Sequence, residues 1–221
     1  MADVEALKKE FGARFTFGGL DVTHELSAET LDAALGGKLR GESLSGLVYN
    51  SGIDSPPGSN TSGALDFSPE DWAKFFAVNV SGFPNILHAV SEVLENPSSV
   101  VAIGSIYGLV SPRLDVYSHF VDGAGTVKHP AYGASKAALM ALVRQYGTHL
   151  APRRIRVNAL TLGGLQGDQD STFQDKFTRN VPQGKMVQAQ DVVGGLVYLL
   201  SDESLGMTSQ NLIVDGGYTA W

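Results

Sequence analysis

Short apolar runs alternate with amphipathic segments along most of the 221-residue chain. Apolar runs rich in β-branched residues are typical of buried strands, and apolar positions at three- and four-residue steps are typical of helices. The pattern predicts strands near residues 14–20, 46–50, 99–104, 154–160 and 211–214. It predicts helices near residues 3–11, 24–35, 69–95, 131–150, 170–180 and 189–201. This alternation indicates an α/β fold, a parallel sheet with helices on both faces.

Local signals refine this pattern. Ser68-Pro-Glu-Asp71 is a strong helix start, because proline suits the first helical position and acidic side chains suit the first turn. Pro84 should kink or interrupt the helix predicted over 69–95. The run from Ser55 to Gly63 is rich in turn residues and reads as a loop rather than an interdomain linker, since the alternation continues beyond it.

Tyr132 and Lys136 lie four positions apart in a segment predicted to be helical. At this spacing both side chains project from one face of the helix. A phenol titrates near pH 10, and a neighbouring ammonium favours its ionised form, which brings its pKa towards the range that acid–base catalysis needs. Taken alone, such a pair is more often part of a solvated helix face than a catalytic pair.

Two further polar residues occupy positions where chemistry is expected. Ser105 ends the apolar run that begins at Ser99, and open α/β sheets bind ligands at the carboxyl ends of their strands. Asn79 lies in a mainly apolar helical stretch, where a buried amide needs hydrogen-bond partners. Both residues could therefore accompany Tyr132 and Lys136 in one site.

In this order along the chain, these residues resemble motifs of the short-chain dehydrogenase/reductase family. The strand-like runs 154–159 and 211–217 complete a resemblance that extends from about residue 5 to the C-terminus. The resemblance implies one Rossmann-like doubly wound domain over residues 1–221 and an NAD(P)-dependent oxidoreductase. Such an enzyme couples hydride transfer to proton transfer between the cofactor and an alcohol or carbonyl substrate.

The resemblance also implies a role for each of the four catalytic candidates. Tyr132 would be the general acid or base that exchanges a proton with the substrate. Lys136 would lower the pKa of Tyr132 and contact the cofactor ribose. Ser105 would hydrogen-bond the reacting oxygen, and Asn79 would hold a water that connects Lys136 to solvent.

Cofactor contacts follow from three further motifs. The run Asn50-Ser-Gly52 resembles the Asn-Asn-Ala-Gly turn of the family, although Tyr49 and Ser51 replace an Asn and an Ala. The run Leu162-Gly-Gly164 stands where the family usually has Pro-Gly beside the nicotinamide, and Asp21 resembles the acidic residue that contacts the adenine. The expected cofactor-binding residues are Asp21, Asn50, Gly52, Tyr132, Lys136, Gly163 and Leu165.

One part of the family pattern has no counterpart. The sequence lacks a counterpart of the family's first two strands, its first helix and the Gly-rich turn that binds the pyrophosphate. We therefore expect an N-terminally truncated sheet. We also expect weak binding of NAD or NADP, and the sequence does not indicate which of the two is preferred. A strand at 14–20 would then be separated from 46–50 by the missing strands. We expect it to slide beside 46–50, with helix 24–35 as the crossover, which would move Asp21 into the space of the cofactor phosphates.

The stretch between Ser105 and Tyr132 is longer than in compact members of the family, and it is either a loop that sets substrate choice or a solvated excursion. It contains the polar and aromatic residues Arg113, Tyr117, His119, Lys128 and His129. Together with the run 162–168, it resembles the subgroup associated with bacterial surface-sugar and flagellin-glycan pathways. A sugar derivative is therefore a possible substrate.

The composition of the chain argues against several other classes of function. The formal net charge is −7 with dispersed basic residues, which argues against a nucleic-acid surface. The chain has no cysteine, which fits a cytoplasmic protein, and no apolar stretch of membrane-spanning length. Its five histidines are dispersed, which argues against a metal site.

Two functions remain open. The first is the oxidoreductase, acting on a small alcohol or carbonyl compound. The second is a non-catalytic subunit that keeps the family's contact faces but does not hold a dinucleotide. By resemblance, either would form a homodimer or homotetramer through the helix that follows Tyr132.

Overall fold

The computed structural model describes residues 2–55, 67–120 and 128–221. Most of the loop predicted between Ser55 and Gly63 lies outside the described residues, as does part of the stretch between Ser105 and Tyr132. None of the described helices is both long and apolar enough to cross a membrane.

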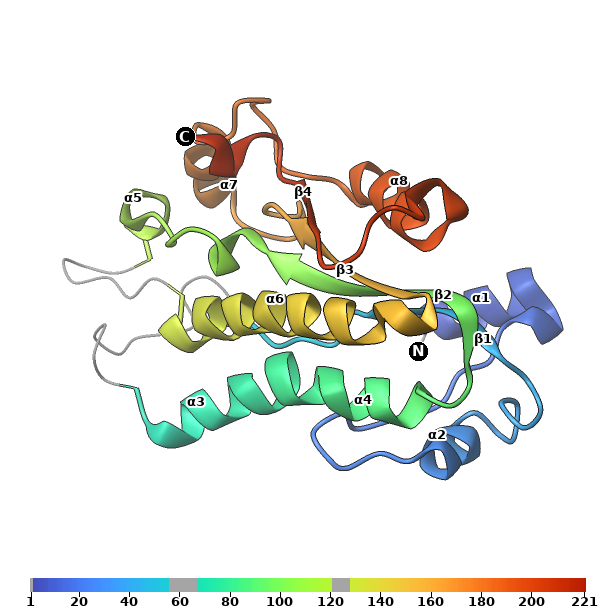
Figure 1. Cartoon of the computed structure of the whole chain (residues 1–221). Coiled ribbons are helices and arrows are strands. Elements are labelled where there is room, and N and C mark those ends of the chain that lie inside the picture. Colours follow the sequence, from blue (N-terminus) through green and yellow to red (C-terminus); the bar gives the residue numbers. More distant parts are fainter. Residues whose placement is uncertain (1, 56–66, 121–127) are drawn as a thin grey trace.

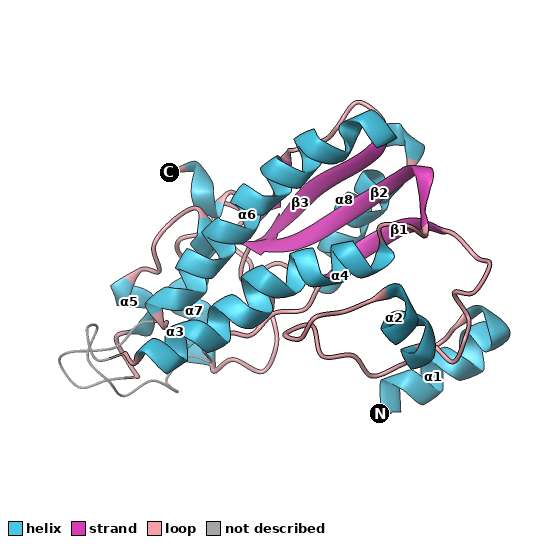
Figure 2. Cartoon of the chain, turned by 60° about the horizontal axis from the view of Figure 1, so that its bottom comes forward, coloured by secondary structure: helices cyan, strands magenta, loops and turns pink. Residues whose placement is uncertain are grey.

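Four parallel strands form the sheet (Figures 1 and 2). They are β1 (Leu44–Tyr49), β2 (Leu94–Ser105), β3 (Ile155–Leu162) and β4 (Asn211–Val214), in the order β1-β2-β3-β4. These strands confirm the predictions at 46–50, 99–104, 154–160 and 211–214. The register places Val48 beside Val101, and Ser105 beside Leu162, so the carboxyl ends of the strands lie at one edge of the sheet.

The helices also follow the predicted alternation. They are α1 (Ala2–Phe11), α2 (Ala28–Ala34), α3 (Pro69–Phe76), α4 (Gly82–Val90), α5 (Leu114–Tyr117), α6 (Pro130–Leu150), α7 (Ser171–Thr178) and α8 (Ala189–Leu200). Helix α2 begins later than predicted because Ser27 caps it, accepting a hydrogen bond from the Thr30 amide at 3.2 Å. The short helix α5 was not predicted.

Helices cover both faces of the sheet, which confirms the doubly wound architecture. Figure 2 shows α4 and α6 in front of the strands and α8 behind them. Because neighbouring side chains of a strand point to opposite faces, Val100 and Ala102 join the core under α4 and α6, whereas Val101 packs with Leu160 and Leu199 of α8. The two cores fix β2 and β3 at the centre of the molecule.

The helix predicted over 69–95 is interrupted, as Pro84 suggested. A π-helical segment, Ala77–Ser81, lies between α3 and α4, one turn before the proline. A proline ring clashes with the carbonyl four residues earlier, and a π segment widens the backbone at that point. The interruption falls on Asn79, whose side chain is completely buried.

The strand predicted at 14–20 is wrong. Residues 15–21 form no regular secondary structure, and the outer edge of β1 has no strand partner among the described residues. The segment instead passes the end of α2, where a Cβ on Gly18 would lie 1.9 Å from the Ala34 carbonyl oxygen. The expected slide beside 46–50 is therefore wrong too, because a close approach that only glycine permits holds this segment against a helix.

Candidate active site

A pocket of about 350 Å³ opens at the carboxyl ends of the strands. Its wall combines the loop after β1, the ends of β2 and β3, the first turns of α6, and side chains from α5 and α7. Of the expected site residues, Ser105, Tyr132, Lys136, Asn50, Gly52, Gly163 and Leu165 line it. Residues from four distant parts of the sequence thus meet at the edge where open α/β sheets bind ligands.

Tyr132 enters the pocket from the first turn of α6, which starts at Pro130 and is capped by His129. The pKa of the Tyr132 hydroxyl is raised to about 12, mainly by burial and to a smaller extent by the nearby Asp54 carboxylate, while the neighbouring Ser105 hydroxyl acts to lower it. The expected lowering of this pKa is therefore not found, because the loss of hydration dominates. At neutral pH Tyr132 holds its proton.

Lys136 lies one turn further along α6 and is almost completely buried. Its Nζ donates a hydrogen bond to the Ile103 carbonyl at 2.9 Å, which ties α6 to the end of β2. Burial lowers the pKa of this ammonium to about 8, against an opposing effect of Asp54. The pKa of Lys136 therefore lies close to neutral pH, and its Nζ lies beside the backbone of Gly52.

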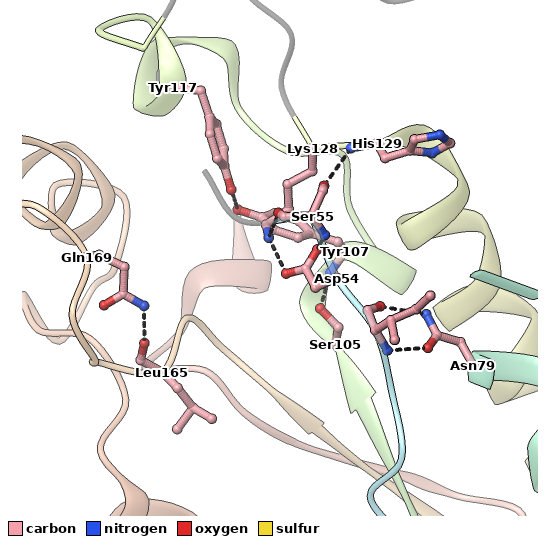
Figure 3. Close-up of polar contacts among 11 residues, drawn as sticks. Asp54, Ser55, Asn79, Ser105, Tyr107, Tyr117, Lys128, His129, Leu165 and Gln169 are labelled. Carbon is pink, nitrogen blue, oxygen red and sulfur yellow. Dashed lines mark hydrogen bonds and ion pairs between the residues drawn. The ribbon is translucent and has the colours of Figure 1, made fainter. Parts of the chain in front are cut away.

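Asn79 holds the loop after β1 in place (Figure 3). Its Oδ1 accepts from the Ile53 amide at 2.8 Å, and its Nδ2 donates to the Ile53 carbonyl at 3.0 Å. The same Nδ2 donates to Ser135 Oγ of α6 at 2.9 Å. The buried amide therefore joins the π segment, the β1 loop and α6, and π segments are frequent at functional sites.

Glycines open the pocket at the places where the chain comes closest. A Cβ on Gly52 would lie 3.3 Å from Lys136 Nζ and would crowd the space in front of the lysine. A Cβ on Gly164 would lie 2.5 Å from the Phe177 ring, and one on Gly163 would lie 2.7 Å from the Asp215 Cα. The Gly-Gly pair after β3 therefore lets this loop pack between α7 and β4.

Asn79 and Asp21 are the two expected site residues that do not line the pocket; Asn79 is bonded to its loop, whereas Asp21 lies apart from it. Its exposed carboxylate accepts hydrogen bonds from the backbone amide and hydroxyl of Thr23, at 2.9 and 2.7 Å, and closes a local turn. The expected adenine contact of Asp21 stays a prediction, whereas its displacement towards the phosphate space falls with the strand slide from which it was inferred.

Tyr117 and Lys128, which the sequence placed in the stretch that could set substrate choice, line the pocket, but two contacts that they make were not predicted. Lys128 forms an ion pair with Asp54, and the Tyr107 and Tyr117 hydroxyls are hydrogen-bonded to each other at 2.7 Å (Figure 3). Burial raises the pKa of both phenols, which holds them neutral. The position of Lys128 four residues before Tyr132 could have indicated its place, but nothing local connects it to Asp54, 74 residues away.

A parallel sheet covered on both faces, with polar groups gathered at the carboxyl ends of its strands, defines a Rossmann-like protein with a ligand site at that edge. A family model described as enoyl-(acyl carrier protein) reductase matches residues 1–219. The chain therefore belongs to the short-chain dehydrogenase/reductase family, a family of oxidoreductases, as its motifs predicted.

Relatives of known name fit this assignment. The chain is 30% identical over 174 residues to 2,3-dihydro-2,3-dihydroxybenzoate dehydrogenase of Escherichia coli K12, covering 71% of this chain and 64% of that protein. It is 30% identical over 232 residues to the inactive 2-(S)-hydroxypropyl-CoM dehydrogenase 2 of Xanthobacter autotrophicus, covering 99% of this chain and 91% of that protein. Post-translational flagellin modification protein A of Campylobacter coli is 32% identical over 54% of this chain and 45% of its own length, in line with the subgroup resemblance.

Solved structures support the fold. A short-chain dehydrogenase from Leptospira borgpetersenii, determined with bound NAD+, superposes with a TM-score of 0.78 at 24% identity. The match covers 94% of this chain and 77% of that structure. The Rossmann-like arrangement is thus shared with an experimentally determined member of the family.

Proposed function

We propose that this chain is an NAD(P)-dependent oxidoreductase that interconverts a small carbonyl compound and its alcohol, with Tyr132 as the general acid or base. The observation that carries the proposal is the meeting of Ser105, Tyr132 and Lys136 in one pocket, held by Asn79 through the loop after β1. The named dehydrogenases among its relatives support the same class of reaction.

The residues around the pocket fit the nicotinamide and ribose half of a dinucleotide. Gly52 leaves a cradle in front of Lys136 that a Cβ would fill, and Asn50, Gly163 and Leu165 line the same space. Lys136 would hold the ribose hydroxyls, and the backbone around Gly163 would lie against the nicotinamide. The cofactor supplies the hydride chemistry when bound.

The chain's own groups handle the proton. With a pKa of about 12, Tyr132 keeps its proton at neutral pH and can deliver it to a carbonyl oxygen that is becoming an alcohol oxygen. Ser105, which lines the same pocket as Tyr132, would donate to that same oxygen and fix its position. Asn79 acts through the Ile53 backbone and Ser135, so we infer a positioning role for it, and the proposed water beside it would return a proton to Lys136.

The proposal also covers the substrate, the oligomeric state and the cellular location of the enzyme. The substrate is a small alcohol or carbonyl compound, with sugar derivatives as one class to test. We propose a homodimer or homotetramer in the cytoplasm, and the exposed Val193 and Val197 of α8, 55% and 57% exposed, support a further covered face. Light scattering on the purified chain measures the assembly directly.

Replacing Tyr132 by phenylalanine tests the function. Tyr132→Phe removes the proton donor and little packing, so turnover with a reducible carbonyl should fall about 100-fold or more while cofactor affinity stays within about threefold. Tyr198→Phe, on the partly exposed face of α8, is the matched control and should keep normal turnover. Oxidation of NADH and NADPH is followed across a panel of ketones and aldehydes.

The same panel of carbonyl compounds distinguishes the proposed enzyme from the alternative, a non-catalytic subunit. A non-catalytic subunit would oxidise neither reduced cofactor with any carbonyl compound. Turnover that survives in Tyr132→Phe would instead move the acid–base role to another group.

A further inference from the structure

Lys128 brings a second positive charge into the pocket, close to the proposed acid. Among the described residues that line the pocket, Asp54, Lys128 and Lys136 carry the charged groups. The Nζ of Lys128 lies 5.2 Å from the centroid of the Tyr132 ring and 5.8 Å from that of Tyr107. Lys136 is hydrogen-bonded to the end of β2, whereas Lys128 lines the pocket beside the Tyr132 ring.

Figure 3 shows the ion pair between Lys128 and Asp54, and its two side chains differ in their exposure to solvent. The side chain of Lys128 is only 10% exposed, whereas that of Asp54 is 39% exposed. Lys128 also donates to the Ser55 carbonyl at 3.2 Å. A buried ammonium needs an anionic partner, but an exposed carboxylate loses little when it returns to water. If the carboxylate of a bound ligand displaced Asp54, Lys128 would remain paired, and the free-energy cost of the displacement would be small.

Asp54 also lies close to the proposed acid. Its carboxylate contributes to the high pKa of Tyr132, and it closes the loop after β1 over the start of α6. A substrate carboxylate bound to Lys128 would take the position of the Asp54 carboxylate and place the rest of the molecule over the Tyr132 ring. The pocket already holds this chemical group in this position, which favours a carboxylate over other anions.

The geometry points to Lys128 as a specificity-determining residue that binds the carboxylate of an oxo acid or hydroxy acid by displacing Asp54. This inference rests on the proposed oxidoreductase function and adds the class of substrate to it. The carbonyl to be reduced would lie a few bonds from the carboxylate, between Lys128 and the Tyr132 and Ser105 hydroxyls.

Three pairs of substrates test this assignment: 2-oxobutanoate, 3-oxobutanoate and 4-oxopentanoate, each against its methyl ester. We expect the wild-type chain to prefer at least one acid over its ester. In Lys128→Met this preference in kcat/KM should fall about 10- to 100-fold, mainly through KM, because one charge-assisted contact is lost. Lys128→Arg should keep most of the preference, and Asp54→Asn should lower KM for the acid.

A matched control comes from a second lysine–aspartate pair. Lys185 lies 3.2 Å from Asp191 at the start of α8, outside this pocket, so Lys185→Met should leave the acid-to-ester preference unchanged. An equal loss for acid and ester in Lys128→Met would mean that the lysine only supports the loop, and would overturn the inference. So would a wild-type chain that reduces the esters but not the acids.

Binding measured without turnover separates this inference from the proposed function. Calorimetric titration with 4-oxopentanoate should show binding to the wild-type chain and at least tenfold weaker binding to Lys128→Met. If that difference appears but no reduced cofactor is oxidised, the proposed function fails and the carboxylate site stands. If esters are turned over and the acids neither bind nor react, the function stands and the carboxylate site fails.

Discussion

The centre of the sheet and the outer side of β1 are built very differently. At the centre, Val101 of β2 is completely buried between two helical layers, whereas its neighbour in register, Val48 of β1, is 38% exposed. Beyond β1, residues 15–21 pass without regular structure, and no side chain described in α1 is buried. The same sheet thus has a tightly packed core and an open edge.

This difference explains where the proposed chemistry lies. Lys136 is bonded to the end of β2, and Asn79 is bonded to the loop after β1 and to α6, so the proton-handling groups sit on the well-packed part. Rigid support of this kind is what a catalytic site needs. Asp21, on the loosely packed side, closes only a local turn. The nicotinamide half of the proposed cofactor site is therefore better built than the adenine half.

Two asparagines, Asn79 in the π segment and Asn85 in α4, give the largest expected contrast. Asn79→Ala removes the partners of the Ile53 amide and carbonyl, so we expect a loss of about 2–4 kcal/mol in the free energy of unfolding and slower turnover. Asn85→Ala removes hydrogen bonds only to the carbonyls of Val22 and His24 on the open side, and should cost about 1 kcal/mol or less. Urea unfolding of both variants measures the contrast, and equal losses would break it.

The paired valines give a contrast of intermediate size. Val101→Ala should lower the free energy of unfolding by about 2 kcal/mol, because it leaves a cavity between β2 and α8. Val48→Ala should lower it by less than about 1 kcal/mol, because that side chain already contacts solvent. If Val48→Ala were as harmful as Val101→Ala, the outer side of β1 would be covered in solution.

Much of the difference between the centre of the sheet and the outer side of β1 could be predicted from the sequence, but part of it could not. The strands at 46–50, 99–104, 154–160 and 211–214 were predictable because each is a short apolar run that alternates with helical segments of the pattern. The run at 14–20 shows the same alternation of residues, but a strand exists only where a partner strand accepts its hydrogen bonds, and periodicity does not report the partner. Its Gly18 and Gly19 favour the irregular path that the chain takes.

The site was predictable to a similar extent. The spacing of Tyr132 and Lys136 and the position of Ser105 after an apolar run indicated the acid–base groups. The Lys128–Asp54 pair and the π segment around Asn79 depend on contacts between distant segments, which no local pattern encodes. The high pKa of Tyr132 results mainly from burial of its hydroxyl, and the extent of that burial could not be predicted from the sequence.

The smallest expected effect concerns the buried lysine of the well-packed side. Because burial lowers the Lys136 pKa from near 10.5 to about 8, the folded chain binds fewer protons than the unfolded chain between these values. Its stability should therefore rise with pH in this window, by about 1 kcal/mol from pH 7 to pH 9. Urea unfolding at both pH values should show this rise in the wild-type chain and lose it in Lys136→Met. Identical pH dependence in the two proteins would contradict the burial of a charged lysine.

The central claim is that the chemistry belongs to the nicotinamide half of the site, built on the carboxyl ends of β1, β2 and β3. Comparing reduced nicotinamide mononucleotide with NADH tests it most directly, since NADH adds only the adenosine phosphate half. We predict kcat/KM values within about tenfold of each other and high-micromolar binding of both, because we expect few charge-assisted contacts to the adenosine phosphate half. Each such contact contributes about 1.5–3 kcal/mol, and 1.4 kcal/mol is tenfold in affinity. A preference for NADH of about 1000-fold, or low-micromolar NADH binding, would contradict the account and place strong cofactor contacts on the outer side of β1.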